Sequence, residues 1–358
     1  MIVIFPMTGP LFFEGHDFHY PKPLIELSDK TLIEHAIDEF VDIPDVEFRF
    51  VIRQEDDRRF QLSSVIHQAA KSLPVKIFIV PDRTSGALCS VLLALPDEEI
   101  TKTQEVIISN YDQKFTCKIA SLIEGFHESD LDFGLFSFDS IHPKWSYVRI
   151  DSKGIVCEAS EKNPISRHAL CGLYYFKDKA TLTDAILGVL RSASPSQEVF
   201  YVSEVLNKLV LMGKRGKIET ICRDDYVNFY EPSILHEYHS LIGNKKDNLI
   251  KLTQSYVSSF NQRDIDAILE HFSEYAVLID PSVNLSSKEQ ISKFLEDFFR
   301  SNQETRFTAN SIHTSVDSSV IHFELAIGDK LYHGTDVIEW LDNKITKLQA
   351  YLTEVPYE

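Results

Sequence analysis

Met1-Ile-Val-Ile-Phe5 opens the chain as a short, uncharged apolar run that is followed by Pro6 and Gly9. Its length and flanks are typical of a buried β-strand and not of a signal peptide. Similar strands recur along roughly the first 240 residues, and helical patterns separate them. We expect strands at Met1–Phe5, Phe48–Ile52, Lys76–Val80 and Glu105–Ser109, and helices at Thr31–Phe40, Gln61–Ser72 and Gly86–Ala94. This alternation predicts a Rossmann-like α/β domain whose mostly parallel sheet is covered by helices on both faces.

A change of pattern near residue 243 predicts a second domain. The polar stretch Gly243–Asn248 is typical of a linker, and after it helices come first and alternating strands follow. We expect helices at Leu249–Asn261, Ile265–His271 and Gln290–Phe299, and strands at Arg306–His313, Ser318–Ala326, Lys330–Leu341 and Lys344–Thr353. This order predicts an α+β fold. We therefore predict a first domain over residues 1–242 and a second over residues 248–358.

Composition and charge exclude several classes of partner. The formal net charge is −18 at pH 7, and a field of that sign repels nucleic acid and anionic membranes. No apolar run approaches the roughly 20 residues of a membrane helix, so we expect a cytoplasmic protein without membrane insertion. The five cysteines are scattered without a Cys-x-x-Cys pair, which argues against a disulfide framework or a metal cluster.

Sheets of the predicted kind bind ligands at the carboxyl ends of their strands, so the residues that follow each strand are candidates for a site. Each such segment alone also fits an ordinary role: a surface lysine, a capped helix, a turn aspartate, or a hairpin turn with a solvated ion pair. The segments are Met1-Ile-Val-Ile-Phe-Pro-Met-Thr-Gly9 with Pro21-Lys-Pro-Leu-Ile25, Thr84-Ser-Gly-Ala-Leu-Cys-Ser-Val-Leu-Leu-Ala94, Val106-Ile-Ile-Ser-Asn-Tyr-Asp-Gln113, and Trp145-Ser-Tyr-Val-Arg-Ile-Asp-Ser-Lys-Gly154 with Glu161-Lys162 and Gly172-Leu-Tyr-Tyr-Phe176. Together and in this order, they resemble the sugar nucleotidyltransferases, a family with a GT-A-like fold.

The resemblance implies a magnesium-dependent enzyme that joins a nucleoside triphosphate to a sugar phosphate or related phosphoalcohol and releases pyrophosphate. It further implies a place in surface polysaccharide synthesis. Lys22 would neutralise phosphate charge and Asp112 would bind Mg²⁺, with Asn228 at the position of the second metal ligand. The resemblance assigns nucleotide contacts to Thr8, Gly9, Thr84, Ser85, Gly86 and Asn110, and substrate contacts to Tyr147, Glu161, Lys162 and Gly172.

The glycine-rich loop departs from the family pattern. Between Gly9 and Tyr20 there is neither Arg nor Lys, so the charge-assisted phosphate contacts of the family are missing. His16 and His19 are the nearest substitutes, although an unperturbed histidine is mostly neutral at pH 7.

The second metal position departs as well. Asn228 is uncharged, and Asp224 or Asp225 would serve only if the register slips. Two hypotheses therefore stand: an enzyme with an altered loop, or a catalytically degenerate nucleotide or sugar-phosphate binder that acts as a scaffold or regulator through its second domain.

Three stretches of the second domain indicate its fold: the helix Leu249–Asn261, the segment His271-Phe-Ser-Glu-Tyr-Ala-Val-Leu-Ile-Asp-Pro281, and the stretch from Gly334 to Tyr351. Together they resemble the SnoaL-like, ketosteroid-isomerase-like α+β cone. Such a cone leaves an apolar cavity, and a buried carboxylate inside it is suited to proton transfer, which is a third hypothesis. The polar candidates are Asp280, His322, Tyr332, His333 and Asp336. We favour dimerisation or partner attachment through the open sheet, and expect a homodimer.

Overall fold

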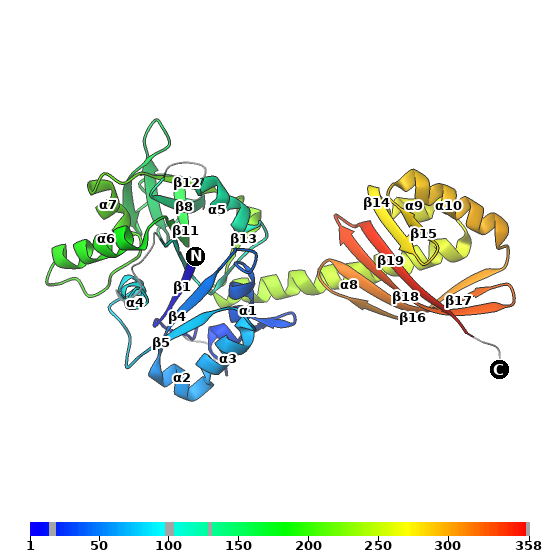
Figure 1. Ribbon diagram of the computed structural model, residues 1–358, viewed down its shortest axis with the longest axis horizontal. Helices are drawn as coiled ribbons and strands as arrows, with labels where there is room; N and C mark the ends of the chain where they lie inside the picture. The colour runs from blue at the N-terminus through cyan, green and yellow to red at the C-terminus, as the bar shows by residue number, and fades with distance from the viewer. Residues whose placement is uncertain (14–18, 97–103, 128–130, 356–358) are drawn as a thin grey trace. The chain divides into compact units, whose positions relative to one another are not determined.

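The structure is a computed structural model that describes residues 1–13, 19–96, 104–127 and 131–355. The chain divides into two compact units, unit 1 from Met1 to Leu235 and unit 2 from His236 to Glu358 (Figure 1). The helix α8 (Pro232–Gln262) contains the division. No helix of the described residues is long and apolar enough to cross a membrane.

Four parallel strands form one part of the large sheet of unit 1. They lie in the order β6-β1-β4-β5, and their bounds are β1 (Ile2–Met7), β4 (Glu47–Arg53), β5 (Val75–Val80) and β6 (Val106–Ser109). Successive residues of β1 enter two different cores, because side chains alternate between the faces of a strand. Val3 and Phe5 belong to one core, and Ile2 and Ile4 belong to the other. The sheet is therefore buried on both faces, as the sequence predicts.

The other part of this nine-stranded sheet is largely antiparallel. β11 pairs antiparallel with β6, β8 and β9, while β12 pairs parallel with β8. The strands of this part are β8 (Phe133–Asp139), β9 (Ser146–Ile150), β10 (Val156–Glu161), β11 (His168–Phe176) and β12 (Gly216–Thr220). The sheet is thus mixed, with its parallel strands contiguous. Asp151 and Gly154 form the turn between β9 and β10, which is the ordinary role that this segment also fits.

Helices cover both faces of the sheet (Figure 1). The core on one face takes residues from α1 (Leu32–Asp38), α3 (Leu62–Ala70) and α5 (Ile119–His127). The core on the other face takes residues from α4 (Ala87–Leu93), α6 (Lys179–Ser192) and α7 (Glu204–Leu211). The remaining elements of unit 1 are α2 (Gln54–Phe60), η1 (Lys22–Leu24), η3 (Arg223–Asp225), β2 (Glu26–Leu27), β3 (Lys30–Thr31), β7 (Gln113–Phe115) and β13 (Tyr226–Asn228).

Unit 2 is a six-stranded sheet packed on helices. The strand order is β15-β14-β19-β18-β17-β16. The elements are α9 (Ile265–Glu270), β14 (Phe272–Asp280), β15 (Val283–Leu285), α10 (Lys288–Ser301), β16 (Thr305–Thr314), β17 (Ser318–Ile327), β18 (Lys330–Leu341) and β19 (Lys344–Glu354). One core joins the helices to one face of the sheet, through residues such as Tyr256, Leu295 and Phe323. The other face lies outside that core.

The predicted linker is the main difference between expectation and structure in this region. Gly243–Asn248 lies inside α8, which is continuous across the division. Leu235, Ile242, Leu249 and Tyr256 recur every seven residues, and this spacing keeps apolar side chains on one stripe of a helix. The polar residues Gly243–Asn248 occupy the roughly two helical turns between the stripe positions Ile242 and Leu249. The division of the chain lies after Leu235 rather than at the predicted boundary of residues 242–248.

Candidate active site

The two candidate catalytic residues are in direct contact. Lys22 Nζ lies 3.1 Å from Asp112 Oδ2, and the side chains are only 9% and 14% exposed. Lys22 begins η1, and Asp112 follows the carboxyl end of β6. Ninety residues separate the two in the chain, so the contact is made by the tertiary fold. It places a neutralised pair of opposite charges at the edge of the sheet where α/β proteins bind ligands.

Two aromatic rings flank the ammonium group of Lys22. Its Nζ lies 5.3 Å from the ring centre of Phe13 and 5.7 Å from that of Tyr230, within the range of cation–π attraction. The backbone N–H of Lys22 donates to the carbonyl of Leu11 at 2.6 Å. The loop after β1 therefore brings an aromatic residue to the lysine. His16 lies outside the described residues, and His19 is exposed.

The strand register settles which residue stands beside Asp112. β13 pairs antiparallel with β7 so that Asn228 is opposite Gln113, and the N–H of Phe229 donates to the carbonyl of Asp112 at 2.8 Å. The slipped alternative is not formed, because Asp225 accepts a hydrogen bond from Thr116 instead. The other alternative, Asp224, is exposed.

Asn228 is held by its neighbours. It is 8% exposed, its Nδ2 donates to the hydroxyl of Tyr226 at 3.3 Å, and its Oδ1 accepts from the N–H of Tyr230 at 2.9 Å. Among the described residues, no group of three or more His, Cys, Asp and Glu is arranged to hold a metal. Asp112 and Asn228 offer one carboxylate and one amide oxygen. This set fits Mg²⁺ only in the mode where substrate phosphates and water complete the coordination.

Three hydroxyl groups tie the end of β1 to the start of α4. Thr8 Oγ1 lies 2.8 Å from Thr84 Oγ1 and 2.9 Å from Ser90 Oγ, and the last two oxygens are 2.8 Å apart. The hydroxyl of Thr84 also donates to the carbonyl of Gly86. Sequence reasoning missed Ser90, although a serine within the apolar run of Ala87–Leu93 is a signal for a buried hydrogen bond.

Neither Thr84 nor Ser85 caps the helix α4 with its side chain. Gly86 is the N-cap of α4, and no side chain makes a cap hydrogen bond. Gly86 has φ +100, and a Cβ there would lie 2.3 Å from the carbonyl oxygen of Phe200. The N–H of Phe200 donates to the carbonyl of Ser85 at 2.9 Å. This glycine therefore accommodates another backbone segment of the chain. Gly9 is exposed, with open space where a side chain would be.

Asn110 and Gly172 come together from different segments. The N–H of Asn110 donates to the carbonyl of Gly172 at 3.2 Å, and a Cβ on Gly172 would lie 2.2 Å from Asn110 Nδ2. Gly172 has φ +76, a conformation that favours glycine. The glycine thus makes room for the exposed amide of Asn110 directly after β6.

Glu161 and Lys162 lie at the end of β10, beside the start of α7. Glu161 Oε2 accepts hydrogen bonds from Ser146 and, at 2.9 Å, from Ser203. Lys162 Nζ lies 3.2 Å from the hydroxyl of Tyr201 and 5.0 Å from its ring centre. This hydrogen bond raises the pKa of Lys162, so its ammonium stays charged. Sequence reasoning did not single out Ser146, Tyr201 or Ser203, whose role depends on tertiary contacts.

The substrate role assigned to Tyr147 is not supported by its position. Its side chain is fully buried, and its hydroxyl donates to the carbonyl of His142 at 2.6 Å. Alternation along β9 turns it into the core, which a ligand cannot reach without disrupting the sheet.

Unit 2 contains an apolar cavity of about 80 Å³ between its helices and the sheet. Asp336 and Asp280 are the carboxylates that line it, and Asp336 is 3% exposed. Burial, and secondarily the charge of Asp280, raises the pKa of Asp336 to about 7. Asp280 accepts hydrogen bonds from the backbone and side chain of Ser282.

The other candidates for this cavity lie elsewhere. His322 and His333 are on the opposite face of the sheet, because they alternate with the core residue Phe323 and the inward Gly334. Tyr332 packs against the core, but it is not among the residues that line the cavity, and its hydroxyl points toward Glu354. The assignment of these three residues to the cavity is therefore wrong.

Comparisons with known proteins support the division into two folds. A nucleoside-diphosphate-sugar pyrophosphorylase from Vibrio cholerae RC9 superposes with a TM-score of 0.57 at 24% identity, over 67% of this chain and 100% of its own. The inositol-1-phosphate CTP transferase from T. maritima superposes with a TM-score of 0.52 at 15% identity, over 67% of this chain and 94% of its own. Unit 1 has the fold of the sugar nucleotidyltransferases.

Residues 253–348 match the family model of the SnoaL-like domain, which identifies the fold of unit 2. No match was found among curated protein sequences. The predicted architecture of two different domains is confirmed: an α/β nucleotidyltransferase-like domain is followed by a SnoaL-like domain.

Proposed function

We propose that unit 1 is a magnesium-dependent nucleotidyltransferase that joins a nucleoside triphosphate to a sugar phosphate or related phosphoalcohol and releases pyrophosphate. The observation that carries the proposal is the contact of Lys22 with Asp112 at the carboxyl edge of the parallel strands. It occurs in a fold shared with proteins named for this chemistry. A place in surface polysaccharide synthesis and a homodimeric state are parts of the same proposal that rest on the family resemblance.

Lys22 supplies the positive charge of the site. In the structure its ammonium pairs with Asp112 and is flanked by two aromatic rings, and the side chain is largely shielded from solvent. When a triphosphate binds, the ammonium of Lys22 shifts from the carboxylate of Asp112 to a phosphate oxygen, because the triphosphate carries more negative charge than the carboxylate. The lysine then stabilises charge that grows on the departing pyrophosphate, and it is positioned for this before substrate arrives.

Asp112 and Asn228 are the residues that would hold Mg²⁺. A bound Mg²⁺ would supply charge neutralisation on the triphosphate and orient it. When triphosphate binding separates Lys22 from Asp112, the carboxylate oxygen of Asp112 that had accepted from the lysine would become available to hold Mg²⁺. In the reaction, a phosphate oxygen of the acceptor forms a bond to the α-phosphorus and the bond to pyrophosphate breaks, with no covalent enzyme intermediate.

Glu161 and Lys162 are proposed to bind the acceptor. Lys162 supplies a charged group for the sugar phosphate, and Glu161 is oriented by two serine hydroxyls for hydrogen bonds with sugar hydroxyls. The partner Tyr201 keeps the ammonium in place.

The test is pyrophosphate release with Mg²⁺, using each of several nucleoside triphosphates against a panel of phosphorylated sugars and polyols. Asp112→Ala and Lys22→Ala should each lower the rate at least about 100-fold, the usual effect of removing a group that stabilises transition-state charge. Lys214→Ala is the matched control, because its ion pair with Asp132 at 3.0 Å lies in the same unit away from the proposed site. The control should retain the wild-type rate.

Two outcomes would decide against transfer. Equal rates in wild type and Asp112→Ala would show that the activity comes from elsewhere. No release from a folded protein that still binds a nucleotide or a sugar phosphate would favour the second hypothesis, a degenerate binder that acts as a scaffold or regulator.

A second candidate function rests on Asp336. A carboxyl group with a pKa of about 7, held in an apolar cavity, is suited to take and return a proton near neutral pH. Exchange of the α-protons of a small ketone for deuterium, followed by proton NMR, tests this role. Asp336→Asn should abolish any acceleration above the buffer rate, and exchange that persists in this variant would rule out Asp336 as the base.

A further inference from the structure

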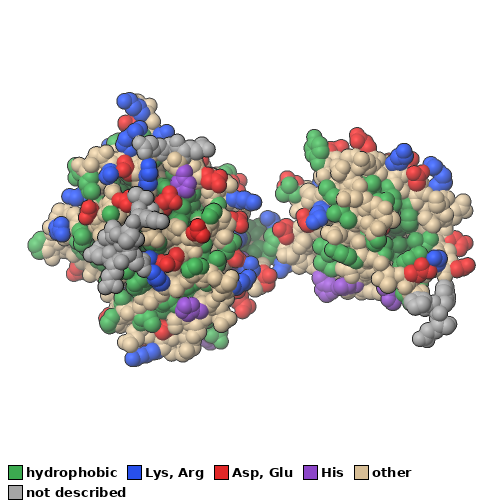
Figure 2. All heavy atoms as spheres, in the orientation of Figure 1, with side chains coloured by type: hydrophobic (Ala, Val, Ile, Leu, Met, Phe, Trp, Pro, Cys, Tyr) green, Lys and Arg blue, Asp and Glu red, His purple; other side chains and the backbone are tan. Residues whose placement is uncertain are grey.

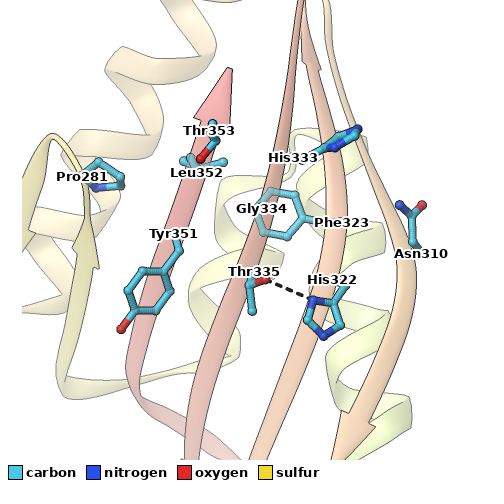
Figure 3. A pocket seen from close by; sticks show the side chains of 10 residues that line it. All are labelled: Pro281, Asn310, His322, Phe323, His333, Gly334, Thr335, Tyr351, Leu352 and Thr353. Carbon is cyan, nitrogen blue, oxygen red and sulfur yellow. Dashed lines mark hydrogen bonds between the residues drawn. The ribbon is translucent and has the colours of Figure 1, made fainter. Parts of the chain in front are cut away.

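A hollow of about 600 Å³ lies on the face of the unit 2 sheet that points away from the helices (Figure 3). Phe323 and Leu325 of β17 enter the core, so the alternate residues of the strand face outward. The pairing of β17, β18 and β19 aligns these outward residues in rows that cross the strands. One row consists of His322, Thr335 and Tyr351, and the next consists of Glu324, His333 and Thr353.

The floor of the hollow is the row between these two. It is formed by Phe323, Gly334 and Leu352, which pair directly across the three strands. A Cβ on Gly334 would lie 2.3 Å from Phe323 Cζ, so the ring occupies the space on the inner side that a larger residue would need. Asn310, at the bulge of β16, and Pro281, after β14, line the two ends.

The hollow is therefore an elongated groove that crosses the strands. Its two side rows are two residues apart along each strand, which corresponds to about 6.6 Å. From β16 to β19 it spans three strand spacings, about 14 Å. A groove of this shape suits a narrow linear molecule rather than a compact one.

The lining residues are polar and uncharged, and the second side row also contains Glu324, whose carboxylate lies beside His333. Lys, Arg, Asp and Glu are absent from the residues that line it, while two imidazoles, two threonine hydroxyls and an amide are present. The imidazole of His322 is 3.1 Å from the hydroxyl of Thr335, and His333 is 3.5 Å from the carboxylate of Glu324. Figure 2 shows histidine side chains on the surface of unit 2. Tyr351 adds an aromatic ring that is 54% exposed.

We propose that this groove binds a neutral linear oligosaccharide, in place of the dimer contact that the sequence led us to expect on this open sheet. Sugars present hydroxyl groups that both donate and accept hydrogen bonds, and the imidazole, hydroxyl and amide groups of the groove can do the same. The C–H faces of sugar rings pack on exposed aromatic rings, and Tyr351 supplies such a ring at one end of the groove. A phosphorylated ligand would require a lysine or arginine at the lining. An extended peptide would pair with a sheet edge instead of crossing the strands. The site is separate from the cavity of Asp336 and does not depend on nucleotidyl transfer by unit 1.

The test uses the full chain on an array of neutral linear oligosaccharides of hexoses, hexosamines and deoxyhexoses, followed by calorimetry with the glycan that binds best. Tyr351→Ala and Thr335→Val should each weaken binding at least tenfold, because they remove the ring and a hydroxyl of the groove. Tyr275→Ala is the matched control, since this tyrosine of β14 is 89% exposed and does not line the groove. The control should bind as the wild type does. Far-UV circular dichroism and the urea midpoint verify that each variant is folded.

Several results would overturn the proposal. Silence of the wild-type protein across the array would do so, as would binding that Tyr351→Ala and Thr335→Val leave unchanged, because the glycan would then sit elsewhere in the chain. Binding restricted to phosphorylated sugars would contradict the neutral class. A wild-type dimer that Tyr351→Ala converts to a monomer, without glycan binding, would assign this face to a second copy of the chain.

Discussion

Asp336 provides a quantitative test of how burial controls a charge in unit 2. Its pKa is raised to about 7, whereas an aspartate in the unfolded chain titrates near 3.8. Between these values the folded state holds a proton that the unfolded state has released. The stability of unit 2 therefore falls as the pH rises from about 4 to about 7, and the loss is complete above the folded-state pKa. A shift of about three units corresponds to about 4 kcal/mol.

Asp336→Asn removes the ionisation while it keeps the size of the side chain. The difference in free energy of unfolding between variant and wild type should grow from near zero at pH 4 to about 4 kcal/mol at pH 8, in favour of the variant. Asp297→Asn is a control, because this aspartate of α10 is 58% exposed beside Arg300. Its effect should stay within about 1 kcal/mol across the range.

The assay is urea unfolding followed by tryptophan fluorescence. The chain has two tryptophans, and Trp340 is buried in the core of unit 2, where it donates to Ser319 at 2.9 Å. Trp145→Phe leaves Trp340 as the only reporter, so the transition of unit 2 is observed alone. If the wild-type protein and Asp336→Asn lose stability in parallel between pH 4 and pH 8, burial does not raise the pKa of Asp336.

Three further predictions concern unit 1, and each is checked by the urea unfolding of unit 1 followed by Trp145 fluorescence in a Trp340→Phe background. Gly86→Ala should lower the free energy of unfolding of unit 1 by more than about 2 kcal/mol, because φ +100 is strained for alanine and the new Cβ meets the backbone of Phe200. An unchanged free energy would contradict this close approach. In a double-mutant cycle, Lys22→Met and Asp112→Asn should each lower the free energy of unfolding by about 2–3 kcal/mol, and the double variant should lose less than the sum of the two. Additive losses would show that the two side chains are not coupled. Burial raises the pKa of Glu39 to about 7, so Glu39→Gln should stabilise unit 1 above that pH and lose the advantage below about pH 4; an advantage that does not change with pH would contradict the shift.

The parallel strands and their helices were predictable because each depends on a short local pattern. β1 and β4 are apolar runs, and α1 carries apolar residues at helical spacing behind the capping box of Thr31 and Glu34. The helix α2 was missed because its sequence, Gln54-Glu-Asp-Asp-Arg-Arg-Phe60, has no apolar periodicity. Its acidic first turn and basic last turn match the helix macrodipole, which is the signal that periodicity alone ignores.

The candidate site was predictable only in part. The order of the segments indicated that Lys22 and Asp112 belong to one site, and the fold brings them into contact. The rings of Phe13 and Tyr230 beside that lysine come from a loop and from the segment after β13, so no local sequence pattern predicts that they lie there.

The assignment of His322 to the cone cavity failed for a different reason. Phe323 is adjacent to it and belongs to the core, and neighbours along a strand face opposite sides, so the sequence did contain the signal against that assignment.

The most direct test of the central claim is pyrophosphate release by the wild-type protein with Mg²⁺, a nucleoside triphosphate and a phosphorylated sugar or polyol. We predict that at least one combination releases pyrophosphate in step with formation of the nucleotide-linked product, and that both stop in Asp112→Ala. A folded protein that releases none with any combination, or one whose release persists at the wild-type rate in Asp112→Ala, would contradict the claim that the pair of Lys22 and Asp112 forms a nucleotidyl-transfer site.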